Sequence, residues 1–546
     1  MKRMDSVILL VLFLFLFGCA AATDSSDEGD DLPMPGSVTG PPSSSDDDND
    51  DDDDSAMSDD DDDNDTSGGP DVPTIIWRDC VLFFPAPWHH LIPNDLACGT
   101  VEAPVDWEES EDTERLEVRF AVAPATGDSP RGVLAVNLGG PDANLRNALL
   151  FSLRPDGLVP AGLTADYHIL FVETRGSFMS STPLVCPETL DGRYFADLER
   201  YRSYVQQCLN AQQSGVSPAL MSTVDAARDL NFVRRALGVE KMRLFGNSYG
   251  SRLMLEYLRL FPESVSAYVL DSTLPPQSTG RHFLDENLDQ LAAACDASDR
   301  CPFADGQALI EETEWLLNEA GGDEDFGWAL TQDLFHLGDR PAVLAAWVGS
   351  LAGALAGDWS LVRQWHDAAK GLRAEPSELD TDEDRFYWDP YADNVMCIDF
   401  PGWNDFAGRE FVLRRLHPPY VSTEQIEAMT HIACQELAAS YTREPTVDRT
   451  PVTATMPGLL IAPRFDQATP SGNAFKAVAE GLVGAAVVPV NADHALLIDL
   501  GADWLGLPDE DQRCLRELVA DWLSDPFDPF DRACVRRLAA PVEVDL

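Results

Sequence analysis

A serine on a tight strand-to-helix turn is the feature of this sequence most able to do chemistry. Residues 242–250 read Met-Arg-Leu-Phe-Gly-Asn-Ser-Tyr-Gly, which places Ser248 between Gly246 and Gly250 in a Gly-x-Ser-x-Gly motif. An apolar run precedes the motif and a helical pattern follows it as far as Phe261. Such a turn holds a serine hydroxyl above the edge of a sheet, and it needs glycines because the backbone is crowded there. The pattern predicts a nucleophilic serine, with a plain glycine-rich turn as the alternative.

A serine hydroxyl needs a base to remove its proton and an acid to orient that base. When a serine elbow comes first in the chain, the acid and then the histidine follow it. His494 comes directly after the last predicted strand, and Asp466 lies in the loop after the strand before it. Asp493 is the rival acid, but as a sequence neighbour of His494 it is poorly placed to orient that ring. We therefore expect a Ser248–Asp466–His494 triad that carries out acyl transfer, with no metal or cofactor.

The elements expected to position these residues alternate between buried strands and helices. A helix is expected from Ser222 to Gly238, because apolar residues share one face and both ends carry stop signals. Apolar runs that are joined by helices indicate a mostly parallel sheet covered by helices, which is an α/β fold. The expected strands are residues 133–137, 167–172, 242–245 (running into the turn at Gly246), 266–271, 458–462 and 485–490.

A long segment separates the two halves of this predicted sheet. Residues 274–452 contain many helical patterns and no clear buried strand. Ser248 and Asp466 are 218 positions apart, far more than adjacent strand–helix units of ~30 residues would need. The segment is predicted to be a helical cap over the serine, and Asp399 within it is a guess for an acid that binds a substrate amine.

The first residues of the chain predict export. Lys2 and Arg3 precede an apolar run, residues 7–17, that is too short to span a bilayer comfortably. The run ends in Leu-Phe-Gly-Cys19, which resembles the lipidation signal of bacterial lipoproteins, and Ala20 after the cysteine favours the outer membrane. Signal cleavage near Ala20-Ala21-Ala22, which would discard Cys19, is the alternative. Residues 1–18 are thus the predicted signal peptide.

An acidic stretch, residues 19–73, follows the signal and is predicted to be a disordered tether. It holds twenty Asp and Glu residues between Thr23 and Val72 and not one Lys or Arg. Such a run repels itself and buries little apolar surface, and it lacks the spaced glycine and terminal glutamate of a folded calcium loop. The net charge of the whole chain is −56, which argues against nucleic acid as a partner.

The cysteine count also fits export. Ten cysteines besides Cys19 are present, and an even number in an exported chain implies disulfides. No Cys-x-x-Cys pair and no suitably spaced histidine supports a zinc site. Sequence order alone does not fix the connectivity, so pairing of nearest neighbours is a hypothesis. The expected pairs are Cys80–Cys98, Cys186–Cys208, Cys295–Cys301, Cys397–Cys434 and Cys514–Cys534.

Several motifs in order resemble the tripeptidyl-aminopeptidase-like branch of the α/β-hydrolases, relatives of prolyl aminopeptidases. The resemblance runs from about Trp77 to Cys534 and implies the triad above, a helical cap and hydrolysis of peptides from a free N-terminus. Its motifs are Cys98-Gly-Thr-Val-Glu-Ala-Pro-Val-Asp106, Asn137-Leu-Gly-Gly-Pro141, Arg175-Gly176, Ser181-Thr-Pro-Leu-Val-Cys186, Gly246-Asn-Ser-Tyr-Gly250, Phe261-Pro262, Leu270-Asp271, Asp466-x-x-Thr469-Pro470, His494 and the pair Cys514 and Cys534.

The resemblance also implies an oxyanion hole and shows where the chain departs from its relatives. The Gly-Gly-Pro turn supplies one backbone N–H, from Gly140, and Tyr249 supplies the other. Asp142 replaces the usual glycine after that turn, Glu173 replaces an aspartate before Arg175-Gly176, and Phe178 stands where a second glycine is usual. These departures put the substrate and the rate in question more than the fold.

The combined expectation is an α/β-hydrolase in which residues 74–273 and 453–546 form the core and 274–452 the cap. The expected activity is that of an exopeptidase that acts on peptides through an acyl-enzyme, held at a membrane by its lipid anchor alone. A carboxylesterase and a non-catalytic surface binding lipoprotein remain alternatives, because fold and triad do not separate esters from peptides. Oligomeric state and side-chain preference cannot be read from the sequence.

Overall fold

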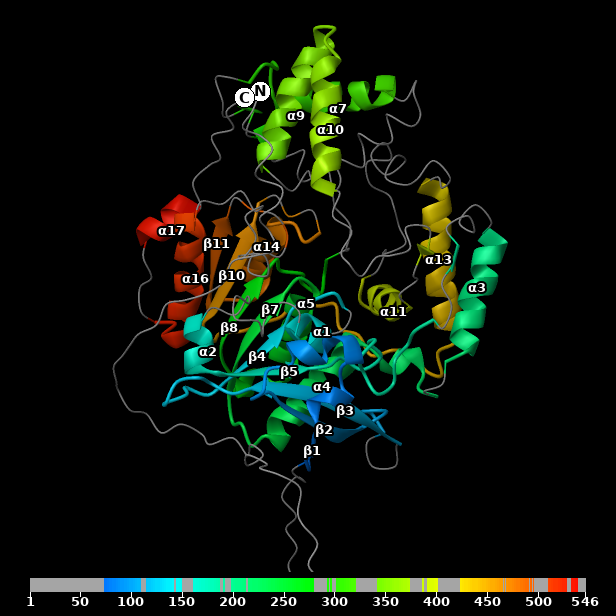
Figure 1. Cartoon of the computed structure of the whole chain (residues 1–546), viewed down its shortest axis with the longest axis vertical. Helices are drawn as coiled ribbons and strands as arrows, with labels where there is room; N and C mark the ends of the chain where they lie inside the picture. Colours follow the sequence, from blue (N-terminus) through cyan, green and yellow to red (C-terminus); the bar gives the residue numbers. More distant parts are fainter. Residues whose placement is uncertain are drawn as a thin grey trace, which may run out of the picture.

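A nine-stranded sheet forms the centre of the molecule (Figure 1). The computed structural model describes residues 73–538, and the predicted signal peptide, Cys19 and almost all of the tether lie outside this range. Within the range it leaves out 110–113, 142–143, 150–160, 187–189, 192–197, 213–214, 279–291, 294, 297–300, 321–340, 374–384, 387–389, 401–422, 465, 467, 491, 493, 495–508 and 528–531.

The sheet combines an antiparallel edge with a parallel part. Its strand order is β1-β2-β3-β5-β4-β7-β8-β10-β11. The pairs β1–β2, β2–β3 and β3–β5 are antiparallel. The pairs β5–β4, β4–β7, β7–β8, β8–β10 and β10–β11 are parallel. All six predicted strands are confirmed, and they make up the parallel part. The strands are β1 (Ile76–Arg78), β2 (Ala97–Pro104), β3 (Arg115–Ala123), β4 (Val133–Asn137), β5 (His168–Val172), β7 (Met242–Asn247), β8 (Val265–Asp271), β10 (Gly458–Pro463) and β11 (Ala485–Val490).

Helices pack on both faces of the sheet, as the sequence predicts. The expected helix after Ser222 is confirmed: α4 begins there with a reciprocal capping box between Ser222 and Asp225, and Gly238, with φ of +72°, follows its end. The helices around the sheet are α1 (Asn144–Asn147), α2 (Ala161–Asp166), α4 (Thr223–Ala236), α5 (Tyr249–Leu260), α14 (Gly472–Glu480), α16 (Asp509–Ser524) and α17 (Arg532–Leu538).

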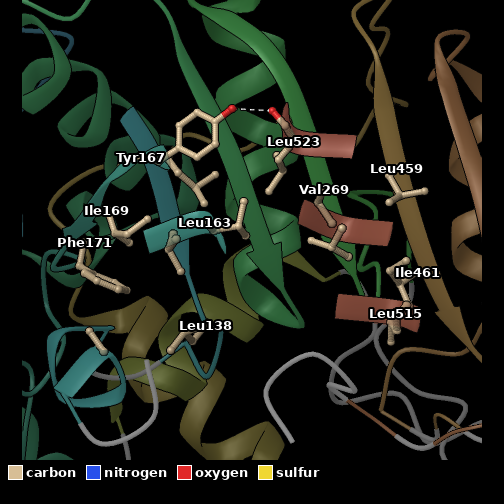
Figure 2. Packing of buried hydrophobic residues seen from close by; sticks show 14 of the residues in the cluster. Leu138, Leu163, Tyr167, Ile169, Phe171, Val269, Leu459, Ile461, Leu515 and Leu523 are labelled. Carbon is tan, nitrogen blue, oxygen red and sulfur yellow. Dashed lines mark hydrogen bonds between the residues drawn. The ribbon is translucent and has the colours of Figure 1, made fainter. Parts of the chain in front are cut away.

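Successive residues of a strand point to opposite faces of the sheet and belong to two separate hydrophobic cores. In β4, Leu134 and Val136 belong to the core shared with α1, α2, α16 and α17, whereas Val133 and Ala135 belong to the core shared with α4, α5 and α14. Figure 2 shows part of the first core, where the Tyr167 hydroxyl donates a hydrogen bond to the Leu523 carbonyl oxygen at 2.7 Å. Burial of each large aliphatic side chain here contributes about 1.5–3 kcal/mol before entropy is counted.

The described part of residues 274–452 is mainly helical. Helices α7, α9 and α10 lie together above the sheet in Figure 1, and the rings of Trp347 and Trp365 pack between α9 and α10 with centroids 4.9 Å apart. The two-residue strand β9 pairs with β6. The elements are α7 (Gly306–Ala320), α9 (Pro341–Leu355), α10 (Ser360–Arg373), β9 (Arg385–Phe386), α11 (Pro390–Asp399) and α13 (Thr423–Ala439), with β6 (Leu190–Asp191) outside the segment.

A second group of helices lies beside the serine end of the sheet. Helix α3 (Leu198–Asn210) comes from outside residues 274–452, yet it packs against α13, and Arg202 forms an ion pair with Glu436. The buried cluster of α3, α11 and α13 also contains Tyr249. The helical layer next to the elbow therefore draws on two stretches of chain, and the boundaries at 274 and 452 stay a prediction.

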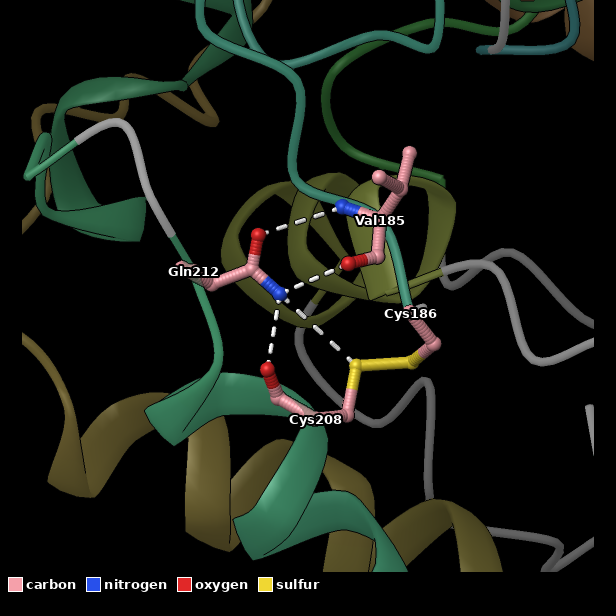
Figure 3. The surroundings of a disulfide bond; sticks show 4 residues. All are labelled: Val185, Cys186, Cys208 and Gln212. Carbon is pink, nitrogen blue, oxygen red and sulfur yellow. Dashed lines mark hydrogen bonds between the residues drawn. A yellow bond between two sulfur atoms is a disulfide. The ribbon is translucent and has the colours of Figure 1, made fainter. Parts of the chain in front are cut away.

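The ten cysteines form five disulfides in the expected nearest-neighbour order. The bridge between Cys186 and Cys208 fixes the position of α3, and the Gln212 side chain beside it bonds both the N–H and the carbonyl of Val185 (Figure 3). Cys397–Cys434 joins α11 to α13. The remaining bridges are Cys80–Cys98, Cys295–Cys301 and Cys514–Cys534.

Candidate active site

Ser248 lies on a strained turn between β7 and α5. Its φ is +52° and its ψ is −126°, a conformation that costs a non-glycine residue about 1–3 kcal/mol. A β-carbon on Gly246 would come within 2.6 Å of the Gly250 carbonyl oxygen, and one on Gly250 within 2.1 Å of the Asn137 carbonyl oxygen. The predicted need for glycine on both sides of the serine is thus confirmed.

The structure brings the three expected triad residues together from the ends of three parallel strands. His494 Nε2 lies 2.9 Å from Ser248 Oγ, and His494 Nδ1 lies 2.9 Å from Asp466 Oδ1. Ser248 follows β7, Asp466 follows β10 and His494 follows β11. Because the carboxyl ends of parallel strands meet at one edge of the sheet, residues far apart in sequence meet there. With the proton on Nδ1, Nε2 can accept the serine proton.

Asp466 is held by several donors besides the imidazole. The carboxylate is 1% exposed, and its Oδ1 accepts hydrogen bonds from the N–H groups of Ala468 and Thr469 at 2.9 and 2.6 Å. The Thr469 hydroxyl donates to Oδ2 at 2.7 Å and lies 3.3 Å from His494 Nδ1. Thr469 is therefore a site residue for which no role was expected, although the Asp466-x-x-Thr469 spacing suits a side-chain-capped turn. The rival acid Asp493 lies outside the described residues.

The Gly-Gly-Pro turn packs directly against the serine. Gly139 has φ of +89°, and a β-carbon on it would lie 2.9 Å from Ser248 Cβ and 3.2 Å from the Tyr249 nitrogen. The Gly139 N–H donates to the Asn137 side chain at 3.0 Å, so it is not available to a substrate. Only a glycine fits this position, because both its dihedral angle and its surroundings exclude a side chain.

The backbone N–H groups of Gly140 and Tyr249, the expected oxyanion donors, make no hydrogen bond recorded among the described residues. Among the described residues, the Gly140 N–H has no acceptor. Tyr249 is the first residue of α5, so its N–H lacks an acceptor within the helix. These are the two expected donors. The turn that presents Gly140 is fixed by Asn144, which accepts from the Leu138 N–H and donates to the carbonyls of Val136 and Val172 at 3.1–3.2 Å.

Arg175 and Glu173 have structural roles. Arg175 is completely buried and bonds both carboxylate oxygens of Asp229 on α4 at 2.5 and 2.7 Å; burial alone disfavours its charge, but Asp229 raises the pKa of Arg175 overall. Glu173 accepts from the Leu145 N–H at 2.6 Å and from the Ser177 hydroxyl. Phe178 is 52% exposed, and Asp142 lies outside the described residues.

The guess that Asp399 binds a substrate amine does not agree with the structure. Asp399 is completely buried, its Oδ2 accepts a hydrogen bond from Thr223 at 2.5 Å, and Arg252 Nε lies 3.4 Å away. A carboxylate enclosed in this way has its charge matched by an arginine of α5 and is closed to a ligand.

The described residues hold neither a cluster of metal-ligating side chains nor a membrane-spanning helix. They contain no group of three or more His, Cys, Asp or Glu side chains that could hold a metal ion. The described helices also include none that is both long and apolar enough to cross a membrane.

Comparison with known proteins agrees with this architecture. Residues 149–305 match a family model described as the alpha/beta hydrolase fold. The chain has the α/β-hydrolase fold. Its serine elbow and the chain order serine, aspartate, histidine are those of that fold.

Two named relatives align with part of this chain. The chain is 30% identical over 239 residues to a tripeptidyl aminopeptidase of Streptomyces coelicolor, and this alignment covers 40% of the chain and 41% of the relative. The chain is 28% identical over 245 residues to serine protease Hip1 of Mycobacterium tuberculosis, and this alignment covers 40% of the chain and 45% of that protein. The chain thus spans less than half the length of these relatives. Among solved structures, an acetylester hydrolase from Corynebacterium glutamicum aligns over 77% of this chain and 95% of its own, with a TM-score of 0.34 and 13% identity.

Proposed function

We propose that this protein is a serine peptidase that cleaves short peptides from a free N-terminus through an acyl-enzyme. The observation that carries the proposal is the unbroken chain from Ser248 Oγ through the His494 ring to Asp466, with both contacts at 2.9 Å. Together with the strained serine and the N–H groups of Tyr249 and Gly140, it supplies every part that acyl transfer needs.

Each group has one role in the proposed reaction. His494 Nε2 removes the proton from Ser248 as its Oγ attacks the carbonyl carbon, and Asp466 stabilises the imidazolium that results. The N–H groups of Tyr249 and Gly140 bind the oxyanion of the tetrahedral intermediate. His494 then returns the proton to the leaving amine, and a water molecule activated by the same histidine releases the acyl group.

The preference for peptides rests on the relatives. Both similar proteins are named as peptidases, a tripeptidyl aminopeptidase and a serine protease. Export is part of the same proposal: a signal peptide, a lipid on Cys19 and an outer-membrane location are supported by the N-terminal sequence and by five disulfides, which persist in oxidising compartments.

The test is a release assay on matched chromogenic substrates. Free-amine aminoacyl, prolyl and tripeptidyl amides are compared with their N-acetylated forms and with simple esters, using the wild type and Ser248→Ala. The proposal expects Ser248-dependent turnover of free-amine peptides and a large loss on acetylation. Turnover of esters alone would establish the carboxylesterase. No turnover and no covalent labelling of Ser248 would establish a binding protein on a hydrolase scaffold.

A further inference from the structure

A buried chain of hydrogen bonds links α11 to the residue that follows the serine. Thr223, the first residue of α4, donates to Asp399 Oδ2 at 2.5 Å, and its Oγ1 lies 2.7 Å from the Tyr249 hydroxyl. Asp399 ends α11, and Tyr249 begins α5. Thr223 and Asp399 are 0% exposed and Tyr249 is 2% exposed, so no solvent competes for these bonds.

The direction of each bond follows from the donors available. Burial raises the pKa of Asp399, whereas Arg252 and the hydrogen bond from Thr223 oppose that rise. The ionised carboxylate accepts hydrogen bonds only, so in that form the single hydroxyl proton of Thr223 is used on Asp399. The Tyr249 hydroxyl is then the donor in its 2.7 Å hydrogen bond with Thr223 Oγ1. Burial raises the pKa of Tyr249, and the neighbouring Asp399 raises it further, so the phenol keeps that proton.

Two arginines, Arg252 of α5 and Arg449, hold Asp399 at its end of this series of hydrogen bonds. Arg252 on α5 lies beside the Asp399 carboxylate and bonds Glu256 at 2.9 Å. Arg449 donates to the carbonyl oxygens of Ile398 and Asp399, which stabilises the last turn of α11. Because a buried carboxylate is costly unless it is paired and hydrogen-bonded, α11 is fixed where Arg252 and Thr223 meet it.

We propose that Asp399, through Thr223 and the Tyr249 hydroxyl, positions the Tyr249 N–H as an oxyanion donor and so couples α11 to the chemistry at Ser248. The inference rests on the proposed function. Asp399 and Thr223 are positioning residues, because they act on the reaction through Tyr249 and contact no reacting atom. An oxyanion donor is effective only when it lies about 2.7–3.1 Å from the developing charge, so a small shift of Tyr249 weakens the transition state more than the bound substrate.

The test removes the two hydroxyls separately and together. We expect Tyr249→Phe and Thr223→Val each to lower kcat about tenfold with KM within twofold, since the loss falls on the transition state. The double variant should lose no more than the worse single variant, because both changes break one chain. Affinity for a boronic acid, which forms a tetrahedral adduct with serine, should fall in parallel with kcat. Thr223→Ser, which keeps the hydroxyl, should restore kcat.

Tyr257→Phe is the matched control. Tyr257 lies two turns along the same helix, is 0% exposed, and its hydroxyl is 2.8 Å from Ser264 Oγ. The Tyr257→Phe variant should lower the melting temperature about as much as Tyr249→Phe does, but its kcat should stay within twofold of the wild-type value. Equal losses of kcat in the two Phe variants, or additive losses in the double variant, would overturn the positioning chain. Turnover that survives Ser248→Ala would instead overturn the proposed function, so the two failures are distinguishable.

Discussion

Replacement of Asp466 by asparagine should abolish the proposed hydrolysis through the tautomer of His494. Asp466 Oδ1 accepts from two backbone N–H groups as well as from the ring, so the oxygen of the introduced amide is expected to keep that position and its NH₂ to face Thr469 Oγ1. The Thr469 hydroxyl, 3.3 Å from Nδ1, is then free to donate to the ring. A proton donated to Nδ1 favours the tautomer with hydrogen on Nε2, which cannot accept a proton from Ser248.

The expected size of this loss can be divided into two parts. In a comparable triad the same change lowers kcat about 10⁴-fold, or about 5 kcal/mol. A single hydrogen bond contributes about 0.5–1.5 kcal/mol, so the bond from Thr469 to Nδ1 should account for up to about tenfold of the loss. Thr469→Val should therefore lower kcat severalfold in the wild type, where it deprives Asp466 of a donor, but raise kcat up to about tenfold in the Asp466→Asn background.

The assay is kcat for all four combinations on one substrate that the wild type hydrolyses, with circular dichroism to show that each variant is folded. Opposite signs of the Thr469→Val effect in the two backgrounds are the expected result. A loss of the same size in both backgrounds would refute the tautomer explanation. An Asp493→Asn variant that is more damaging than Asp466→Asn would refute the choice of acid.

Three further outcomes are expected. Gly139→Ala should lower kcat at least about tenfold, because the added β-carbon would press on Ser248. Gly238→Ala is the control: its φ is also positive (+72°), so it should cost similar backbone strain, but open space surrounds it and kcat should be unchanged. Equal kcat in the two variants would contradict the packing argument. Burial raises the pKa of Asp225 from 3.8 to about 6, so between these pH values the folded state binds a proton that the unfolded state has lost. The unfolding free energy of the wild type should therefore fall by about 3 kcal/mol, relative to that of Asp225→Asn, as the pH rises from below 4 to 7. Denaturant titrations of both proteins at the two pH values check the sign. Cys19→Ser should move the protein from the membrane fraction to the soluble fraction, and an unchanged distribution would rule out the lipid anchor.

Much of the parallel sheet could be predicted because its strands are buried on both faces and therefore appear as continuous apolar runs. The antiparallel strands β1, β2 and β3 were not predicted, although β3 alternates charged and apolar residues from Arg115 to Phe120. That alternation is typical of a strand with one face covered. It is short and lacks the continuous apolar run of the central strands, so the antiparallel edge of the sheet was found from the structure alone.

The triad residues could be predicted because chain order and strand ends restrict where they lie. The roles of Thr469 and Asp399 could not, because they depend on which partners the fold brings near. An acidic residue in a helical segment suggests a binding site for an amine, but the sequence does not show that Arg252, 147 positions earlier, lies beside Asp399. Pairing of buried charges across the fold is the information that the sequence lacks.

Covalent labelling of Ser248 tests the central claim most directly. The folded protein is incubated with a fluorophosphonate, digested and mapped by mass spectrometry, beside His494→Ala and denatured wild type. The triad geometry predicts a single adduct on the peptide that contains Ser248, with labelling strongly reduced in His494→Ala and absent after denaturation. An adduct on another serine, or equal labelling of Ser248 in all three samples, would contradict a nucleophile activated by His494.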